Sequence, residues 1–511
     1  MPMKYDVVVV GAGNSGLTAA CRCAMEGKKT LLIEQHNLPG GCASSFCRGR
    51  FEFDPSVHEI CDFGPDDNKG AVRLLLERLG VNVDWVTIED CYRCITKYSD
   101  GTPMDVTMPS GRGPFIDKME EYVPGSRESM NKLFDLMEEI QAALNYMTDG
   151  TPNDSKYMQQ HFPNTLRTGA YPTNKVFRAL KLPQKAIDIL STYWAYLGVD
   201  LDHDAFIHYA NMVHMYVTRK AVIPRHTSHE ISMEFIKRFR ELGGDVWYNC
   251  RAEKFLFDGD RISGVVTNMG TIECDYVLAN INPDIIYGKM MPKELVPERE
   301  KKLSAARNED YSARMFACYF GLNKPLEEIG IKDYTVFMPG TSDSVKEAAS
   351  FERIDTNEYC IFLGYNIANP DFSPKGTGVV SFTSMYGKKD WSDLEIKDYN
   401  KMKEAIAKKF IETTKEKMGI DITPYIEEVE IATPWTFARY LGTPEGCTYG
   451  HKTKDWDAMM NRMMMIGEDY PIKGLKHIGA AASRGDGYSS TWIIGDMLAG
   501  IACGEMKEGG K

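Results

Sequence analysis

A continuous apolar run opens the chain and is followed at once by glycines. Residues 7–10 are four valines, which predict a strand buried on both faces, and a helical pattern begins a few positions later. Gly11, Gly13 and Gly16 fall at the turn, where they permit a tight bend, close approach of a pyrophosphate and packing of the helix on the strand. Glu34 ends a second strand, where its carboxylate can accept a ribose hydroxyl. This order of strand, glycine turn, helix, second strand and terminal acid predicts that the chain binds an adenine dinucleotide.

Alternating patterns in the middle of the chain predict a mixed sheet. An amphipathic helix over 231–242 ends at Gly243-Gly244. Strand-like segments follow at 245–249, 254–257, 261–268 and 271–280. A three-stranded insertion whose last strand returns to the parallel sheet is typical of flavin-binding Rossmann domains.

The segments on either side predict a second unit beside that sheet. Residues 115–218 follow a helical pattern, with a long irregular connection over 148–175 that is rich in Pro, Asn, Thr and Gly. Residues 285–432 combine strands at 315–322, 360–365 and 378–385 with a long helix over 396–418. We expect these to form a domain of sheet and helix over the cofactor.

A second strand, loop and helix lie near the end of the chain. Residues 475–482 are predicted to form a strand, 483–487 a glycine-bearing loop and 488–503 a helix with an apolar face. In flavoproteins, such a helix N-terminus faces the pyrimidine end of the flavin and favours its anionic reduced form. A helix that only packs against the sheet is the alternative.

Composition and charge exclude several classes of protein. A chain of 511 residues is too long for one core, so we expect at least two domains. The formal charge of −12 argues against nucleic acid as a partner. The chain contains no run of 18 apolar residues, and a strand from residue 5 leaves no room for a signal peptide, so we expect a cytoplasmic protein.

The cysteines and histidines predict no metal site. The 13 cysteines are an odd number, and we expect most of them to be free thiols. Cys91 and Cys94 form a C-x-x-C pair without a second pair at zinc-site spacing, and the 10 histidines follow no ligand pattern.

Four motifs together resemble one family of flavoproteins. The second motif runs from Gly40-Gly41-Cys42 to Phe46 and continues through 51–54 to His58. The third comprises Thr433-Pro434-x-Thr436-x-x-Arg439-Tyr440-Leu441 and Gly446-x-Thr448-Tyr449-Gly450, and the fourth spans 474–487. With the N-terminal glycines, these segments resemble the phytoene desaturase-like flavoproteins, in particular the branch that holds carotenoid isomerase and retinol saturase.

The resemblance implies an α/β fold with FAD as cofactor. It implies a discontinuous FAD-binding domain of the GR2 type, a parallel sheet plus a β-meander, over 1–75, 219–285 and 440–511. A mixed α+β substrate domain with a helical subdomain is implied over 76–218 and 286–439. Cofactor contacts are expected at Gly11, Gly13, Asn14, Ser15, Gly16, Glu34, Gly40, Gly41, Cys42, Ala252, Gly479, Asp486, Gly487 and Tyr488.

Two departures from the family pattern bear on the substrate. Residues 224–227 read Pro-Arg-His-Thr where the family has Pro-Arg/Lys-Gly-Gly, so His226 and Thr227 add bulk near the flavin. Residues 484–487 read Arg-Gly-Asp-Gly in place of Pro-Gly-x-Gly. Both changes favour an unsaturated compound that is smaller or more polar than a long carotenoid.

Reduction of an activated C=C bond needs a hydride from the flavin and a proton from a group within hydrogen-bond reach. Candidate donors are His58, His226, His229, Tyr449 and Tyr488, each of which could instead be a polar group in the wall of the site. His226 is the favoured proton donor, because it stands where the family has a glycine that leaves space near the flavin. Arg439 could bind a substrate carboxylate or carbonyl, or form an internal salt bridge.

The leading interpretation is an FAD-dependent oxidoreductase that saturates a C=C bond in a hydrophobic substrate. Redox-neutral cis–trans isomerisation or desaturation of a polyene is the rival with the same cofactor. One further alternative is a non-catalytic lipid-binding protein on this scaffold, as in Rab GDP-dissociation inhibitors. Another is an amine oxidase-like flavoenzyme. The electron donor is left open, with NAD(P)H as a candidate, and the methionine-rich segment 459–465 is a candidate for peripheral membrane contact or for ordinary packing.

Overall fold

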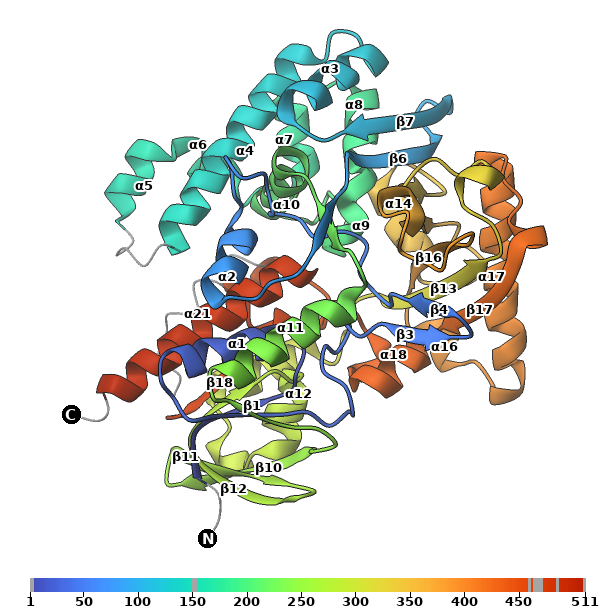
Figure 1. The fold of residues 1–511 in the computed structure, drawn as a ribbon. Coiled ribbons are helices and arrows are strands. Elements are labelled where there is room, and N and C mark those ends of the chain that lie inside the picture. Colours follow the sequence, from blue (N-terminus) through green and yellow to red (C-terminus); the bar gives the residue numbers. More distant parts are fainter. Residues whose placement is uncertain (1–3, 149–153, 458–460, 463–471, 484–486, 509–511) are drawn as a thin grey trace.

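A parallel sheet with an antiparallel extension organises the first part of the fold. The computed structural model describes residues 4–148, 154–457, 461–462, 472–483 and 487–508 (Figure 1). The strand order is β10-β11-β12-β1-β2-β9, and β18 pairs with β12. β12, β1, β2, β9 and β18 are parallel, whereas β10 and β11 extend β12 as an antiparallel meander, which confirms the prediction. The bounds are β1 (Lys4–Val10), β2 (Thr30–Ile33), β9 (Asp245–Trp247), β10 (Ala252–Asp258), β11 (Arg261–Thr267), β12 (Gly270–Ala279) and β18 (Leu475–His477).

Both faces of β1 are buried, which explains its unbroken run of valines. Val7 and Val9 belong to the core formed with α1 (Asn14–Met25), α11 (Ser228–Glu241) and α21 (Gly487–Glu508). Val8 and Val10 face the opposite core, under the meander. Figure 1 shows α1 beside both α11 and α21 on one side of this sheet. A Cβ on Gly495 of α21 would lie 2.4 Å from the Ser15 carbonyl oxygen, so these two helices are in backbone contact.

A second, largely antiparallel sheet lies over the first unit. Its order is β17-β13-β16-β15-β14-β6-β7, with only β14 and β6 parallel among the pairs described. One face packs on α17 (Ile396–Met418) through Phe316, Phe382 and Phe410. The other face joins the core of the first sheet. The strands are β6 (Asp90–Lys97), β7 (Pro103–Pro109), β13 (Arg314–Leu322), β14 (Thr335–Met338), β15 (Cys360–Gly364), β16 (Gly378–Tyr386) and β17 (Ile426–Ala432).

Helices fill the chain between β7 and β8 (Val222–Pro224), as predicted. They are α3 (Arg112–Tyr122), α4 (Arg127–Thr148), α5 (Ser155–His161), α6 (Pro163–Thr168), α7 (Thr173–Ala179), α8 (Gln184–Leu190), α9 (Trp194–Leu197) and α10 (Phe206–Arg219). The predicted irregular connection over 148–175 is wrong where the structure describes it, because α5 and α6 lie there. Polar side chains cap these helices: Asp154 of this segment accepts the Lys156 N–H, and Glu139 of α4 accepts the Asn164 and Thr165 N–H groups.

The predicted strand over 475–482 is also corrected. β18 ends at His477, because Gly479 turns with a φ of +102° into the short helix α20 (Ala480–Ser483). The first sheet draws its strands from 4–33, 245–279 and 475–477, and the second from 90–109 and 314–432. This partition supports the domain division given above, which we propose. Across the described ranges, every helix is too short or too polar to cross a bilayer.

The remaining elements connect the two sheets. A hairpin of β3 (Phe46–Arg48) and β4 (Phe51–Phe53) precedes α2 (Ala71–Leu79), and β5 (Trp85–Thr87) pairs with β8. Other helices are α12 (Pro283–Ile285), α13 (Glu298–Arg307), α14 (Ser344–Ser350), α15 (Tyr365–Ala368), α16 (Lys389–Ser392) and α18 (Pro434–Leu441).

Candidate active site

The glycines after β1 form a cradle at the start of α1. A Cβ on Gly16 would lie 1.9 Å from the Gly11 carbonyl oxygen, and one on Gly11 would lie 2.8 Å from that of Asn280. Gly11 has a φ of +94°. Gly13 is the N-cap of α1 and offers no side chain to the first N–H groups of the helix, and the first turn carries no acidic residue. These groups are therefore available to an anion such as a pyrophosphate.

The second motif closes one side of this cradle. The Gly40 N–H donates to the Ala12 carbonyl at 2.8 Å, and Gly40 forms a single parallel bridge with Gly13. A Cβ on Gly40 would lie 2.3 Å from the Ala43 carbonyl oxygen, and Gly41 lies over the Cα of Gly13. Both glycines have positive φ, so the chain reverses there without side chains in the cradle.

Glu34 marks the other end of the cradle. Its carboxylate accepts the Ala12 N–H at 2.7 Å and the His36 N–H at 2.8 Å. Ala252 begins β10 close by, because the Cys250 N–H donates to the Glu34 carbonyl. Gly479 faces the Asn280 side chain. The two motifs, the start of β10 and the end of β18 thus meet at the carboxyl ends of the parallel strands, where cofactors bind in open α/β sheets.

The start of α21 also joins the site. The Ser15 hydroxyl donates to the Thr491 carbonyl at 2.6 Å, which ties α1 to α21. Tyr488 reaches the second motif, with its hydroxyl 3.2 Å from Ser56 Oγ, and Ser56 in turn donates to the Cys42 carbonyl. Gly487 begins the helix with a φ of +83°. Asp486, Arg484 and all of segment 459–465 except Asn461 and Arg462 lie outside the described residues.

These residues fit a flavin dinucleotide. The Asn14 Oδ1 and Trp492 Nε1 atoms, on α1 and α21, are buried and have no hydrogen-bond partner among the residues that the structure describes. Buried polar atoms of this kind indicate groups that a ligand satisfies. The bare helix N-terminus and the two glycine turns supply the backbone N–H donors that a pyrophosphate needs, whereas Asn14 Oδ1 can only accept a hydrogen bond, for example from a hydroxyl of the ligand.

Residues 55–59 run from the second motif through the space between the sheets. Four tyrosine hydroxyls hold their backbone: Tyr319 donates to the Pro55 carbonyl, Tyr365 to Val57, Tyr334 to His58 and Tyr216 to Glu59. Asp54, just before this segment, is buried and accepts the Ser228 N–H at 2.8 Å, which ties it to the start of α11. Burial raises the pKa of Asp54 to about 6, against the hydrogen bonds from Ser228.

Five side chains of this region are enclosed by protein yet keep accessible surface. Burial raises the pKa of Cys42 to about 11, raises those of Tyr196, Tyr216 and Tyr488 well above their usual range, and lowers that of His58 to about 4. Cys42 is exposed and the other four are half-buried. They come from the second motif, α9, α10 and α21.

His58 and Tyr449 lie in this region. The His58 Nε2 atom is 3.1 Å from the Thr383 hydroxyl, and its ring centroid lies 5.9 Å from that of Tyr196. Tyr449 packs against Gly198, where a Cβ would lie 2.9 Å from its ring. The structure thus places His58 beside Tyr196 of α9, Tyr449 beside Gly198 at the end of α9, and Tyr488 beside Ser56.

His226 and Arg439 are placed differently. His226 is exposed, and its N–H lies 3.4 Å from Glu230. His229 is half-buried, and its Nδ1 atom has no partner. Arg439 is exposed on α18 and forms no ion pair among the residues described. α18 approaches the ribose end of the cradle, where the rings of His36 and Tyr440 are 6.1 Å apart.

Sequence reasoning missed Glu59. Its side chain is 6 % exposed, Oε1 accepts the Tyr196 hydroxyl at 3.0 Å, and Oε2 is buried without a partner. Burial raises the pKa of this carboxyl to about 8, although the Tyr196 hydrogen bond opposes the shift. The signal available was weak, because Glu59 stands in a mixed segment that also holds Asp54, Ser56, His58 and Asp62.

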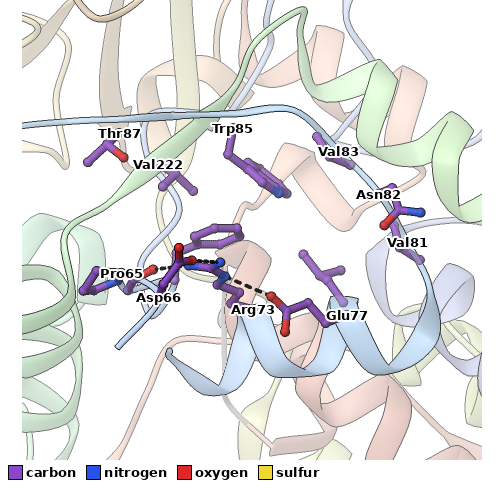
Figure 2. A pocket seen from close by; sticks show the side chains of 13 residues that line it. Pro65, Asp66, Arg73, Glu77, Val81, Asn82, Val83, Trp85, Thr87 and Val222 are labelled. Atoms are coloured by element: carbon purple, nitrogen blue, oxygen red, sulfur yellow. Dashed lines mark hydrogen bonds and ion pairs between the residues drawn. The ribbon is translucent and has the colours of Figure 1, made fainter. Parts of the chain in front are cut away.

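A separate cleft of about 580 Å³ opens beside α2 (Figure 2). Trp85 of β5 projects over it, and Phe63 forms part of its wall. The Arg73 guanidinium binds Asp66 and, at 3.0 Å, Glu77. None of the predicted site residues lines this cleft, and two carboxylates already satisfy its arginine.

Comparisons with known proteins agree with this geometry. Residues 9–79 match the family model of the NAD(P)-binding Rossmann-like domain. The chain is 25% identical over 510 residues to an all-trans-retinol 13,14-reductase of Danio rerio, covering 93% of this chain and 82% of that protein. It is 22% identical over 517 residues to prolycopene isomerase 2 of an Oncidium hybrid cultivar, covering 98% and 83%. A putrescine oxidase structure has the same fold, with a TM-score of 0.64 at 14% identity over 98% of this chain and 99% of that one.

The fold and the cradle define an FAD-dependent oxidoreductase of the Rossmann type. The similarity to all-trans-retinol 13,14-reductases and prolycopene isomerases over most of the chain fits a phytoene desaturase-like family, as the motifs predicted.

Proposed function

We propose that this protein is an FAD-dependent saturase that reduces an activated C=C bond in a hydrophobic, unsaturated substrate. The observation that carries the proposal is a group of partly accessible aromatic side chains, Tyr196, Tyr216 and Tyr488, which form hydrogen bonds to Ser56 and Glu59 beside the cradle. Aromatic rings of this kind suit a conjugated substrate. The relatives named all-trans-retinol 13,14-reductase support reduction as the direction.

The residues of the cradle hold the cofactor in this proposal. Gly11, Gly13 and Gly16 with the start of α1 bind the pyrophosphate, and Gly40 and Gly41 cover it. Glu34 binds the adenosine ribose. FAD, once reduced, supplies a hydride to carbon.

The substrate pocket supplies orientation and excludes water. The rings of Tyr193, Tyr196 and Tyr216 stack with centroids 5.2 to 5.8 Å apart and give a rigid apolar wall. His58 is neutral near pH 7, because burial lowers its pKa to about 4, so it orients neighbours through Thr383 rather than carrying charge. This rigid surface holds a planar conjugated system in one orientation.

A visible spectrum of the purified protein tests the cofactor first. The reduced enzyme is then mixed anaerobically with enones, polyenes and unsaturated acids, and reoxidation of the flavin is followed. We expect reoxidation together with a product two hydrogens heavier than the substrate. A colourless protein that stays so after addition of FAD would contradict the proposal.

Redox-neutral isomerisation is the second candidate, favoured by the relatives named prolycopene isomerase. The same experiment separates the two reactions, because isomerisation gives a product of equal mass and leaves the flavin reduced. We propose NAD(P)H as the first electron donor to test, by anaerobic titration of the oxidised enzyme.

A further inference from the structure

The end of α18 lies against the two residues that follow Glu34. The rings of His36 and Tyr440 meet edge to face, with centroids 6.1 Å apart and an interplanar angle of 72°. A Cβ on Gly442, the C-cap of α18, would lie 3.3 Å from the side-chain nitrogen of Gln35. Because the Glu34 carboxylate is the group proposed to bind the ribose, α18 borders the place where the adenosine of the cofactor would lie.

Local hydrogen bonds fix the position of α18 at both of its ends. The Thr433 hydroxyl accepts the Thr436 N–H, and the Thr436 hydroxyl accepts the Thr433 N–H, which together form a capping box. At the other end, Gly442 has a φ of +67° and its N–H donates to the Ala438 carbonyl. α18 follows directly on β17, so a helix continuous with the second sheet is held against a loop of the first.

Tyr440 presents an open aromatic ring at this position. Its side chain is 56 % exposed, whereas the ring of its neighbour His36 is held in place, because the His36 Nδ1 atom accepts the Leu38 N–H at 3.3 Å. A single exposed aromatic residue is common on protein surfaces. Here, however, the exposed ring stands next to the ribose end of the cradle and against a second ring of fixed orientation. The two rings form an accessible aromatic wall beside Glu34.

We propose that Tyr440 is a cofactor-binding residue that packs, together with His36, against the adenosine of FAD. A purine has a flat face that stacks on aromatic side chains. The proposal rests on FAD as the cofactor and not on the reaction at the C=C bond. It also means that FAD bridges the two sheets, because the cradle of the first sheet binds the pyrophosphate while α18, which continues β17, covers the adenosine.

Titration of the apoprotein with ADP and with FMN separates the two halves of the cofactor, because ADP carries the adenosine and FMN carries the isoalloxazine. We expect Tyr440→Ala to raise the Kd for ADP and for FAD about 5- to 150-fold, as for loss of one contact between a base and an aromatic ring. The Kd for FMN should not change. Tyr440→Phe keeps the ring and should bind all three ligands as the wild type does.

The matched control is Trp435→Ala, at a second exposed aromatic residue of the same helix. Trp435 is 54 % exposed, and its indole N–H donates to the Trp391 carbonyl at 3.3 Å. It lies five residues before Tyr440 and therefore points about 140° away from it around the helix axis. We expect the Kd for ADP to stay at the wild-type value in this variant.

Amide hydrogen exchange gives a second readout on the wild-type protein. Addition of ADP to the apoprotein should slow exchange over α18, whereas addition of FMN should not. An unchanged Kd for ADP in Tyr440→Ala, an equal loss of ADP and FMN binding, or exchange over α18 that ADP does not slow would each overturn the role of Tyr440. If ADP and FAD bind as expected but the reduced enzyme reduces no unsaturated acceptor, the proposed function fails and the role of Tyr440 stands.

Discussion

The hydroxyl of Tyr319, on β13 of the second sheet, donates to the carbonyl oxygen of Pro55 at 2.9 Å. This bond joins the second sheet to the segment that carries His58 and Glu59. It is one of four tyrosine hydrogen bonds to the carbonyls of Pro55, Val57, His58 and Glu59, which come from β13, α15, the residue before β14 and α10 and together position this backbone.

Removing this hydroxyl should destabilise the fold. Tyr319→Phe leaves the Pro55 carbonyl without its donor, and we expect the free energy of unfolding in urea to fall by about 1–3 kcal/mol. The control is Tyr171→Phe, at a side chain that is 48% exposed, where a change within about 0.5 kcal/mol is expected. Equal stabilities of the two variants would show that water satisfies the Pro55 carbonyl.

Gly16→Ala should abolish cofactor binding. The added Cβ would lie 1.9 Å from the Gly11 carbonyl oxygen, which forces the cradle open. We expect the purified variant to carry no flavin, as seen in its absorbance. The matched control is Gly504→Ala in α21, because the added Cβ meets nothing within 4 Å. The free energy of unfolding of this variant should rise by up to about 1 kcal/mol, because alanine has the higher helix propensity. A yellow Gly16→Ala protein would contradict the assigned cradle.

Glu34→Gln should weaken FAD binding without unfolding the protein. The amide can accept only one of the two N–H groups that the carboxylate holds, from Ala12 and His36, and it offers the ribose a neutral acceptor. Loss of one charge-assisted hydrogen bond is worth about 1.5–3 kcal/mol, which corresponds to a Kd for FAD about 10- to 150-fold higher. Equilibrium titration of the apoprotein measures this, and an unchanged Kd would remove Glu34 from the ribose site.

His58 should make the protein acid-sensitive. Burial lowers its pKa from 6.5 to about 4, so between these values the unfolded chain binds a proton that the folded protein does not. Stability is therefore lost as pH falls from about 6.5 to about 4. Urea unfolding at pH 7 and at pH 4.5 measures this loss in the free energy of unfolding. In His58→Gln the loss between the two pH values should be smaller than in the wild type, by an amount of order 1–3 kcal/mol. The same replacement at exposed His161 is the control, and an equal effect there would argue against burial as the cause.

Local pattern predicted the elements that carry the cofactor. The β1–α1–β2 unit and the meander follow from short-range signals: buried valines, glycine turns and alternating strands. The long helix was predicted with the bounds that α17 has, Ile396–Met418, because amphipathic periodicity over many turns is a strong signal.

Elements that depend on distant partners were not found. β6 and β7 read as a mixture of charged, polar and apolar residues, and β6 becomes an interior strand only by pairing with β14, about 240 positions away, at Val336 and Phe337. Glu59 was missed for the same kind of reason. An acid in a sequence is normally exposed, and the burial of Glu59 is set by Tyr196 of α9 and Tyr216 of α10, which are distant in the sequence.

The backbone contact between Gly495 and Ser15 has a consequence for synthesis in the cell. A ribosome makes the dinucleotide motif first and the helix that completes its packing almost 500 residues later. The apolar surface that α21 covers on α1 and the first sheet therefore stays uncovered through nearly all of translation, and nascent chains released before α21 would be clients for chaperones or proteases.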